Sequence, residues 1–219
     1  MRKQLILLII LCLPVIAIQA QRRPVDPGLQ GLYKFADEYF RSDPFKGQFS
    51  DFLKHLINDP DIENKEILKK TDTSFYSFYG EYKTYNPFFI KPKRIEILLQ
   101  EVSIAYGDTA KAVDTIFQYQ LLAFLNNDKK GREDLKKEFD KIHRQTQRKF
   151  FDNGYKEMSQ GNEITGAFHN YFVPYHSLAP ATVLWSEVKE KEELVLNITL
   201  RFKKEGNETI LPMPFYGAK

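Results

Sequence analysis

The amino-acid sequence predicts an α+β domain in which helices cover one face of a largely antiparallel, curved sheet of about five strands. Two observations predict this class. Apolar residues recur at the three- and four-residue spacing of helices in the first third of the chain and again in residues 131–153. Apolar and polar residues alternate, as they do in strands, in residues 94–125 and 181–205.

The first twenty residues have the pattern of a cleaved secretory signal. Two basic residues precede an apolar run from Leu5 to Ile18, and Ala20 stands before the expected cleavage site. An uncleaved membrane anchor is the competing interpretation, but the run is shorter than the roughly 20 apolar residues that span a bilayer, and Pro14 interrupts it. We therefore expect an exported protein with no membrane span in its mature part.

The composition of the mature chain argues against several classes of function. The formal net charge of the whole chain is +3 and falls to +1 when Arg2 and Lys3 leave with the signal. A nearly neutral chain has no electrostatic basis for binding nucleic acid. The one cysteine, Cys12, lies in the signal, so the mature chain has no disulfide, no thiolate nucleophile and no cysteine metal site. An exported domain without disulfides favours a bacterial periplasmic or cell-surface location.

Residues 21–28 form a polar, proline-containing lead-in that we expect to be mobile, and residues 29–219 form a single globular domain. The segment Ser42-Asp43-Pro44 is a helix-start signal, because a side-chain oxygen can cap the first amides and proline suits the first turn. The expected helices of this region are 29–40, 45–58 and a short one at 61–70.

The centre of the chain is expected to be an antiparallel pair of strands at 94–106 and 114–125, because β-branched and aromatic residues alternate there. The same apolar residues also fit a helix face, so a helical alternative stays open for this segment. One long helix is expected from Gly131 to about Asn153, and Ser159–Pro180 is expected to be irregular. The remaining strands are predicted at 181–191, 193–205 and 209–215. This order of elements is similar to that of NTF2-like cone folds, in which a curved sheet often encloses a pocket.

The densest group of aromatic side chains lies in residues 75–89. Tyrosine combines an apolar ring with a polar tip, which suits both half-buried packing and the binding of ligands or partners. The candidate binding residues are Tyr76, Tyr79, Tyr82, Tyr85 and Phe88. Ordinary packing of a core and a hairpin around Gly80 is the alternative. The partners that such a surface suits are another protein, a glycan or an apolar ligand.

Most catalytic signatures are missing from the sequence, including the nucleophile elbow, the phosphate loop, the dinucleotide fingerprint and the His-Glu-x-x-His pair. We expect no cofactor and assign no metal site. One group of candidate catalytic residues lies in the segment expected to be irregular: Glu163, His169 and His176. Their spacing matches no zinc pattern. The sequence therefore favours an exported, non-catalytic binding protein, and a periplasmic hydrolase, metal-assisted or not, that uses the 161–180 loop is the alternative.

Overall fold

The structure is a computed structural model that describes residues 27–68, 74–106, 112–150, 152–161, 163–173 and 179–203. Its strands are β1 (Ile62–Leu68), β2 (Ser74–Tyr82), β3 (Arg94–Tyr106), β4 (Ala112–Asn126), β5 (Asp152–Gln160), β6 (Glu163–Phe172), β7 (Ala181–Val188) and β8 (Glu193–Phe202). They form one eight-stranded sheet in the order β1-β2-β3-β4-β8-β7-β6-β5. Every neighbouring pair is antiparallel.

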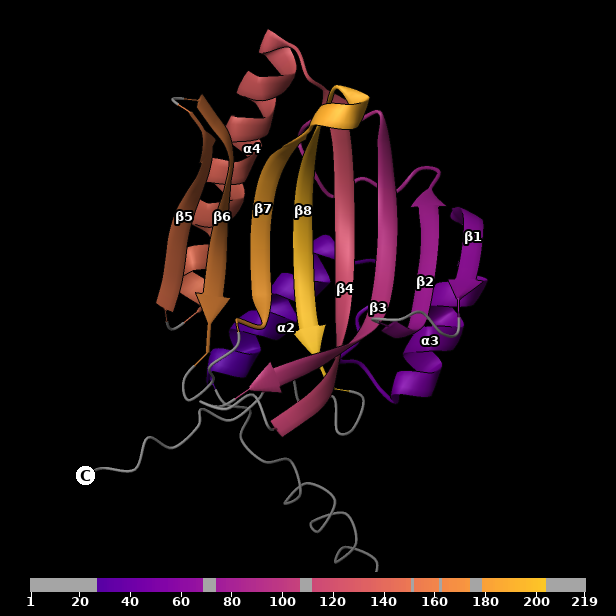
Figure 1. Cartoon of the computed structure of the whole chain (residues 1–219). Coiled ribbons are helices and arrows are strands. Elements are labelled where there is room, and N and C mark those ends of the chain that lie inside the picture. The colour runs from indigo at the N-terminus through magenta and orange to yellow at the C-terminus, as the bar shows by residue number, and fades with distance from the viewer. Residues whose placement is uncertain are drawn as a thin grey trace, which may run out of the picture.

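Three α-helices lie on one side of this sheet (Figure 1). They are α2 (Pro27–Tyr39), α3 (Phe49–Asn58) and α4 (Lys129–Thr146), and two 3-10 turns, η1 (Gln147–Lys149) and η2 (Lys189–Lys191), follow α4 and β7. Asp128 caps α4, because its Oδ1 accepts a hydrogen bond of 2.6 Å from the Gly131 amide. Within the described ranges, none of the helices is long and apolar enough to cross a membrane.

The chain builds the sheet in two halves of similar element order. Helices α2 and α3 precede the meander β1–β4, and helix α4 precedes the meander β5–β8. The last strands of the two halves, β4 and β8, pair with each other at the centre of the sheet. This topology leaves β1 and β5 as the two edges and places the middle of β4 and β8 far from either edge.

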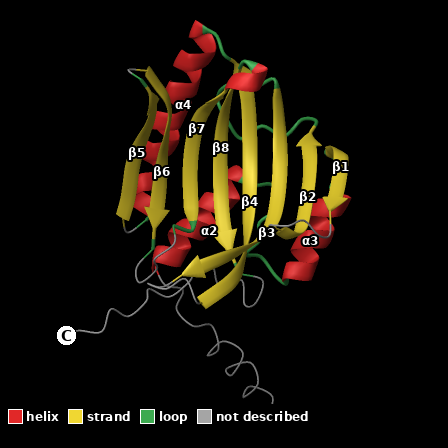
Figure 2. Ribbon diagram, viewed as in Figure 1, coloured by secondary structure: helices red, strands yellow, loops and turns green. Residues whose placement is uncertain are grey.

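Alternation along the strands divides the sheet into two faces. Tyr119 of β4 packs against Phe40 and Phe52, with ring centroids 4.6 and 5.3 Å apart, so the face that carries Tyr119 lies beneath the first two helices. On the same face, His169 of β6 packs against Phe139 of α4. Figure 2 shows the three α-helices behind the sheet and no described α-helix in front of it. We call these two surfaces the covered face and the open face.

The prediction of about five strands with one long central helix is wrong, because the sheet has eight strands. The segment expected to be a short third helix is the edge strand β1, in which only the first residue is buried. The long helix ends at Thr146 rather than near Asn153, and the chain continues into the exposed edge strand β5. The segment expected to be irregular contains β6. The predicted similarity to the element order of NTF2-like folds is also wrong, because it assumed a sheet of about five strands.

Other expectations for individual elements are confirmed. Residues 94–125 contain two paired strands, not a helix, and the two strong alternating segments near the end of the chain are β7 and β8. Helix α3 begins at Phe49, later than expected, because the preceding residues form a turn in which Asp43 Oδ1 accepts a hydrogen bond of 2.8 Å from the Phe45 amide. The expected signal at 1–20 and the expected strand at 209–215 lie outside the described residues.

Candidate functional site

The open face is the candidate functional site, because its centre carries uncharged side chains. Surfaces that contact only water are rich in Lys, Glu and Asp, whereas these residues are depleted at the core of a binding surface. Uncharged side chains hold the open-face positions in the middle of β4, β8, β7 and β6: Gln118, Gln120, Leu122, Asn197, Thr199, Thr182, Leu184, Phe168 and Asn170.

A row of four hydrogen-bonding side chains crosses the centre of this face. The strand register pairs Gln120 with Thr199, Thr199 with Thr182, and Thr182 with Asn170. Directly opposed side chains in antiparallel strands are neighbours, and adjacent strands lie about 4.8 Å apart, so the row is about 14 Å long. We call these four residues the polar row.

Hydrogen bonds inside the polar row fix its side chains and leave part of each amide free. Thr182 Oγ1 donates to Asn170 Oδ1 over 2.8 Å, and Gln120 Nε2 donates to Thr199 Oγ1 over 3.4 Å. In the part of the chain that the structure describes, the amide nitrogen of Asn170 and the carbonyl oxygen of Gln120 have no hydrogen-bond partner. The row therefore offers at least one donor and one acceptor to a ligand.

Apolar and aromatic side chains border the polar row. The neighbouring row of the strand register crosses the same four strands. Its residues, in order across the sheet, are Leu122, Asn197, Leu184 and Phe168, and all four are partly exposed. Tyr79 of β2 extends the same face beyond β3. The open face thus combines apolar contact area with hydrogen-bonding groups, as ligand-binding surfaces do.

Arg201 lies beside the polar row on β8. Its Nη1 donates to Thr182 Oγ1 over 2.7 Å and to the backbone oxygen of Ala179 over 3.0 Å. Gln118 is its register partner on β4. Burial lowers the pKa of the Arg201 guanidinium from its ordinary value. No carboxylate among the described residues pairs with Arg201, and this distinguishes it from the arginine at the other end of the face.

That other arginine, Arg94, is fully paired. Its Nη1 and Nη2 donate to the two carboxylate oxygens of Glu193 over 2.8 and 2.9 Å, and its Nε donates to Glu96 over 2.6 Å. The guanidinium also lies 3.8 Å from the ring centroid of Phe124. The hydrogen bonds from Arg94 lower the pKa of the Glu193 carboxyl. This end of the open face is therefore a closed, charge-balanced cluster.

The structure separates the five aromatic residues that the sequence selected for binding. Tyr82 and Phe88 are 7% and 6% exposed and belong to the core. Tyr85 packs on Tyr82 with ring centroids 4.9 Å apart, and Tyr76 packs, partly buried, against the same core. Tyr79 is the one of the five that lies on the open face, where its hydroxyl donates to a glutamate of its own strand over 2.8 Å. The five residues do not form one surface.

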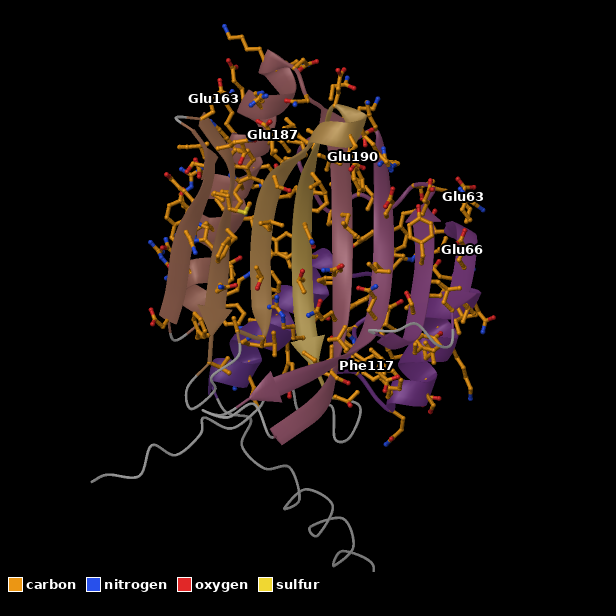
Figure 3. The ribbon with its side chains drawn as sticks, in the orientation of Figure 1. Glu63, Glu66, Phe117, Glu163, Glu187 and Glu190 are labelled. Atoms are coloured by element: carbon orange, nitrogen blue, oxygen red, sulfur yellow. The ribbon has the colours of Figure 1, made fainter. Side chains whose placement is uncertain are left out.

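The predicted catalytic group is also divided. His169 is 7% exposed on the covered face and stacks on His143 of α4. Glu163 is exposed at the far end of β6 (Figure 3), and six residues of strand place it about 20 Å along the strand from His169. His176 lies outside the described residues. Glu163 and His169 therefore do not share a site.

His143 is the partner that the sequence analysis missed. Burial lowers its pKa, and burial together with the neighbouring imidazole lowers the pKa of His169 to about 4. The signal was present in the spacing, since His143 follows Phe139 by four residues and therefore lies on the same side of the helix. Both rings are held among aromatic side chains, which suits packing better than proton transfer to a substrate.

A cavity on the helical side lies between the end of α2 and the start of α3. It has a volume of about 480 Å³ and adjoins a second hollow of about 560 Å³. The two share four lining residues: Arg41, Ser42, Asp51 and His55. Arg41 is already paired there, with Asp59 over 3.0 Å and with Asp61 over 3.1 Å. We assign no function to this cleft, because its central cation binds the protein itself.

Neither a metal-binding group nor a similar known protein points to a function for the described residues. Across the described ranges, no group of three or more His, Cys, Asp or Glu side chains is arranged to hold a metal ion. No protein-family model, no curated protein and no solved structure matches the chain. The open face is therefore the basis of the candidate site.

Proposed function

We propose that this chain is an exported, non-catalytic protein that binds a glycan on the open face of its sheet. The observation that carries the proposal is the polar row, Gln120, Thr199, Thr182 and Asn170, at the centre of a face without acidic side chains or lysine in its middle. The signal-like pattern of residues 1–20 supports export to a compartment where glycans are exposed.

Glycans fit this face better than an apolar ligand does. Sugar hydroxyls both donate and accept hydrogen bonds, and side-chain amides and hydroxyls match them in both roles. The apolar C–H face of a sugar ring can pack on side chains such as Leu122, Leu184 and Phe168. The polar row is about 14 Å long, which accommodates a short oligosaccharide. An apolar ligand would leave the amides of the row unpaired at a cost in free energy.

The hydrolase alternative receives no support from the arrangement of its candidate residues. The imidazole of His169 is buried against His143, and Glu163 lies about 20 Å away along β6. A general acid–base pair must lie within hydrogen-bond reach of one substrate. We therefore propose no reaction for this chain.

The test is a screen of the mature chain, residues 21–219, against an array of oligosaccharides, followed by calorimetric titration of those that bind. The variant Q120A/N170A removes both free amide groups from the polar row. Each lost hydrogen bond weakens binding by about fivefold, so the variant should bind at least about tenfold more weakly than the wild type.

A matched control removes two amides from elsewhere on the surface. Gln145 of α4 and Asn153 of β5 are exposed and do not belong to the open face, so Q145A/N153A should bind like the wild type. Thermal melts check that both variants fold. Binding of no oligosaccharide, or equal binding by Q120A/N170A and the wild type, contradicts the proposal. If instead a protein binds the open face, the ligand of this face is a protein and not a glycan.

A further inference from the structure

The guanidinium of Arg201 presents unused hydrogen-bond donors next to the polar row. Both of its protein hydrogen bonds are made by Nη1, to Thr182 Oγ1 and to the oxygen of Ala179. Within the described ranges, Nε and Nη2 have no protein acceptor. An arginine whose planar edge is free binds a carboxylate through two parallel hydrogen bonds.

A comparison with Arg94 shows that Arg201 lacks a carboxylate partner among the described residues. Arg94 has two carboxylate partners, Glu193 and Glu96, at distances of 2.6 to 2.9 Å. Arg201 is partly buried, yet its neighbours in the described residues are a hydroxyl, a backbone carbonyl and the amide of Gln118. A partly buried cation without an anionic partner is costly, and a ligand that brings the anion recovers that cost.

We infer that the glycan bound by the open face is acidic and that its carboxylate pairs with Arg201. The inference rests on the proposed glycan-binding function of the same face. The sugar hydroxyls bind the partly exposed amides of Gln120 and Asn170 at the two ends of the polar row, because Thr199 and Thr182 between them are buried. The carboxylate accepts hydrogen bonds from Arg201 Nε and Nη2. Thr182 holds the guanidinium by its Nη1 and at the same time donates to Asn170, so the charge and the row are positioned together.

The position of Gln118 adds a second recognition element. It is the direct register neighbour of Arg201, and Gln100 is the register neighbour of Gln118 on β3. Neither side-chain amide has a hydrogen-bond partner among the described residues. These amides continue the hydrogen-bonding surface past Arg201. A sugar whose carboxylate pairs with Arg201 therefore has hydrogen-bonding side chains on both sides of that carboxylate.

The test compares hexuronate oligosaccharides with the same compounds after reduction of each carboxylate to a primary alcohol. Charge-assisted hydrogen bonds contribute roughly tenfold to a hundredfold to binding, so the wild type should bind the acidic form at least about tenfold more tightly than the reduced form. R201Q should lose this preference and bind both forms as the wild type binds the reduced one. Arg144 is exposed on α4, and R144Q should keep the preference.

The outcomes separate the inference from the function beneath it. Equal binding of acidic and reduced forms by the wild type overturns the inference and leaves glycan binding intact. The preference persisting in R201Q also overturns it. No binding of acidic, reduced or neutral oligosaccharides rejects the proposed function itself. If R201Q does not fold, the preference of the wild type between the two forms still decides the inference.

Discussion

The imidazole rings of His143 and His169 lie face to face, with centroids 3.7 Å apart and ring planes 8° from parallel. One ring belongs to α4 and the other to β6, so the pair joins the helix to the outer part of the sheet. Nδ1 of His143 lies 3.2 Å from the hydroxyl of Tyr171, a neighbour on the same strand as His169. A proton on either ring would place a positive charge against the other ring in a buried setting.

The stability of the protein should therefore fall in mild acid. The pKa of His169 is about 4 when the protein is folded, against about 6.5 for an unfolded chain. Between these two values the unfolded state binds a proton that the folded state does not, so the free energy of unfolding decreases as pH falls through this window. From about pH 7 to about pH 4.5 the loss due to His169 is roughly 2 to 3 kcal/mol, measurable by urea unfolding.

The variant H169F isolates this effect, because a phenylalanine retains an aromatic ring against His143 and cannot take up a proton. Its loss of stability over the same pH range should be smaller than that of the wild type by roughly 2 kcal/mol. Asp140 near His143 opposes part of the shift of that ring and is unchanged in the variant. H55F, on the exposed side of α3, is the control and should follow the wild type. Equal losses in H169F and the wild type would refute the assignment.

The fold was predictable from sequence where the residue pattern is produced by burial. In β8, Leu194, Leu196 and Ile198 recur at every second position and pack into the core, and this spacing predicted the strand, although Val195 and Thr199 on the other face are also buried. In β1, six of the seven residues are exposed, so no burial pattern marks the strand. The strand β6 lies in the segment that the sequence predicted to be irregular. A side chain at its Gly166 would overlap Met158 and the backbone of the adjacent strand, so this glycine is required by packing.

The candidate site could not be predicted, because no local sequence pattern specifies the strand register that brings its residues together. Gln120 and Thr199 are 79 residues apart in the chain, and only the pairing of β4 with β8 makes them neighbours. Tyr79 was one of five aromatic residues that the sequence selected as candidates for binding, and it lies on the open face. The sequence does not single out Arg201, since its lack of a carboxylate partner among the described residues is visible only in three dimensions.

The ion pair between Arg94 and Glu193 should contribute measurably to stability. Glu193 is 7% exposed, and its two carboxylate oxygens accept hydrogen bonds from the two terminal nitrogens of Arg94. E193Q leaves the arginine with one carboxylate instead of two, and we expect the free energy of unfolding to fall by about 1 to 3 kcal/mol. Glu133 is exposed on α4, and E133Q should change stability by less than about 0.5 kcal/mol.

A double-mutant cycle with R94M distinguishes the pair from the individual residues. If the interaction is direct, R94M/E193Q is less destabilised than the sum of the two single variants, by about 1 kcal/mol or more. Additive effects would mean that the two side chains stabilise the sheet independently. The folded carboxyl of Glu193 has a lowered pKa, so this contribution is present at neutral pH and is lost as pH falls through the range in which Glu193 becomes protonated.

The close approach of α2 to η1 should make Gly31 intolerant of a side chain. A Cβ at this position would overlap the backbone oxygen of Lys149. Alanine normally stabilises a helix by about 1 kcal/mol relative to glycine, yet we expect G31A to lower the free energy of unfolding by about 2 kcal/mol because the helix must move away from η1. Gln30, the exposed neighbour, is the control, and Q30A should be nearly neutral. A gain of stability in G31A would show that the two elements are not packed this closely.

The most direct measurement of the central claim is a methyl NMR titration of residues 21–219 with an oligosaccharide that binds them. Leu122 and Leu184 lie on the open face, and the preceding residues, Leu121 and Val183, lie on the covered face and are fully buried. Binding on the open face predicts that the methyl signals of Leu122 and Leu184 shift on titration, while those of Leu121 and Val183 change little. Shifts confined to the α2–α3 cleft or to the methyl groups beneath the helices would contradict the account.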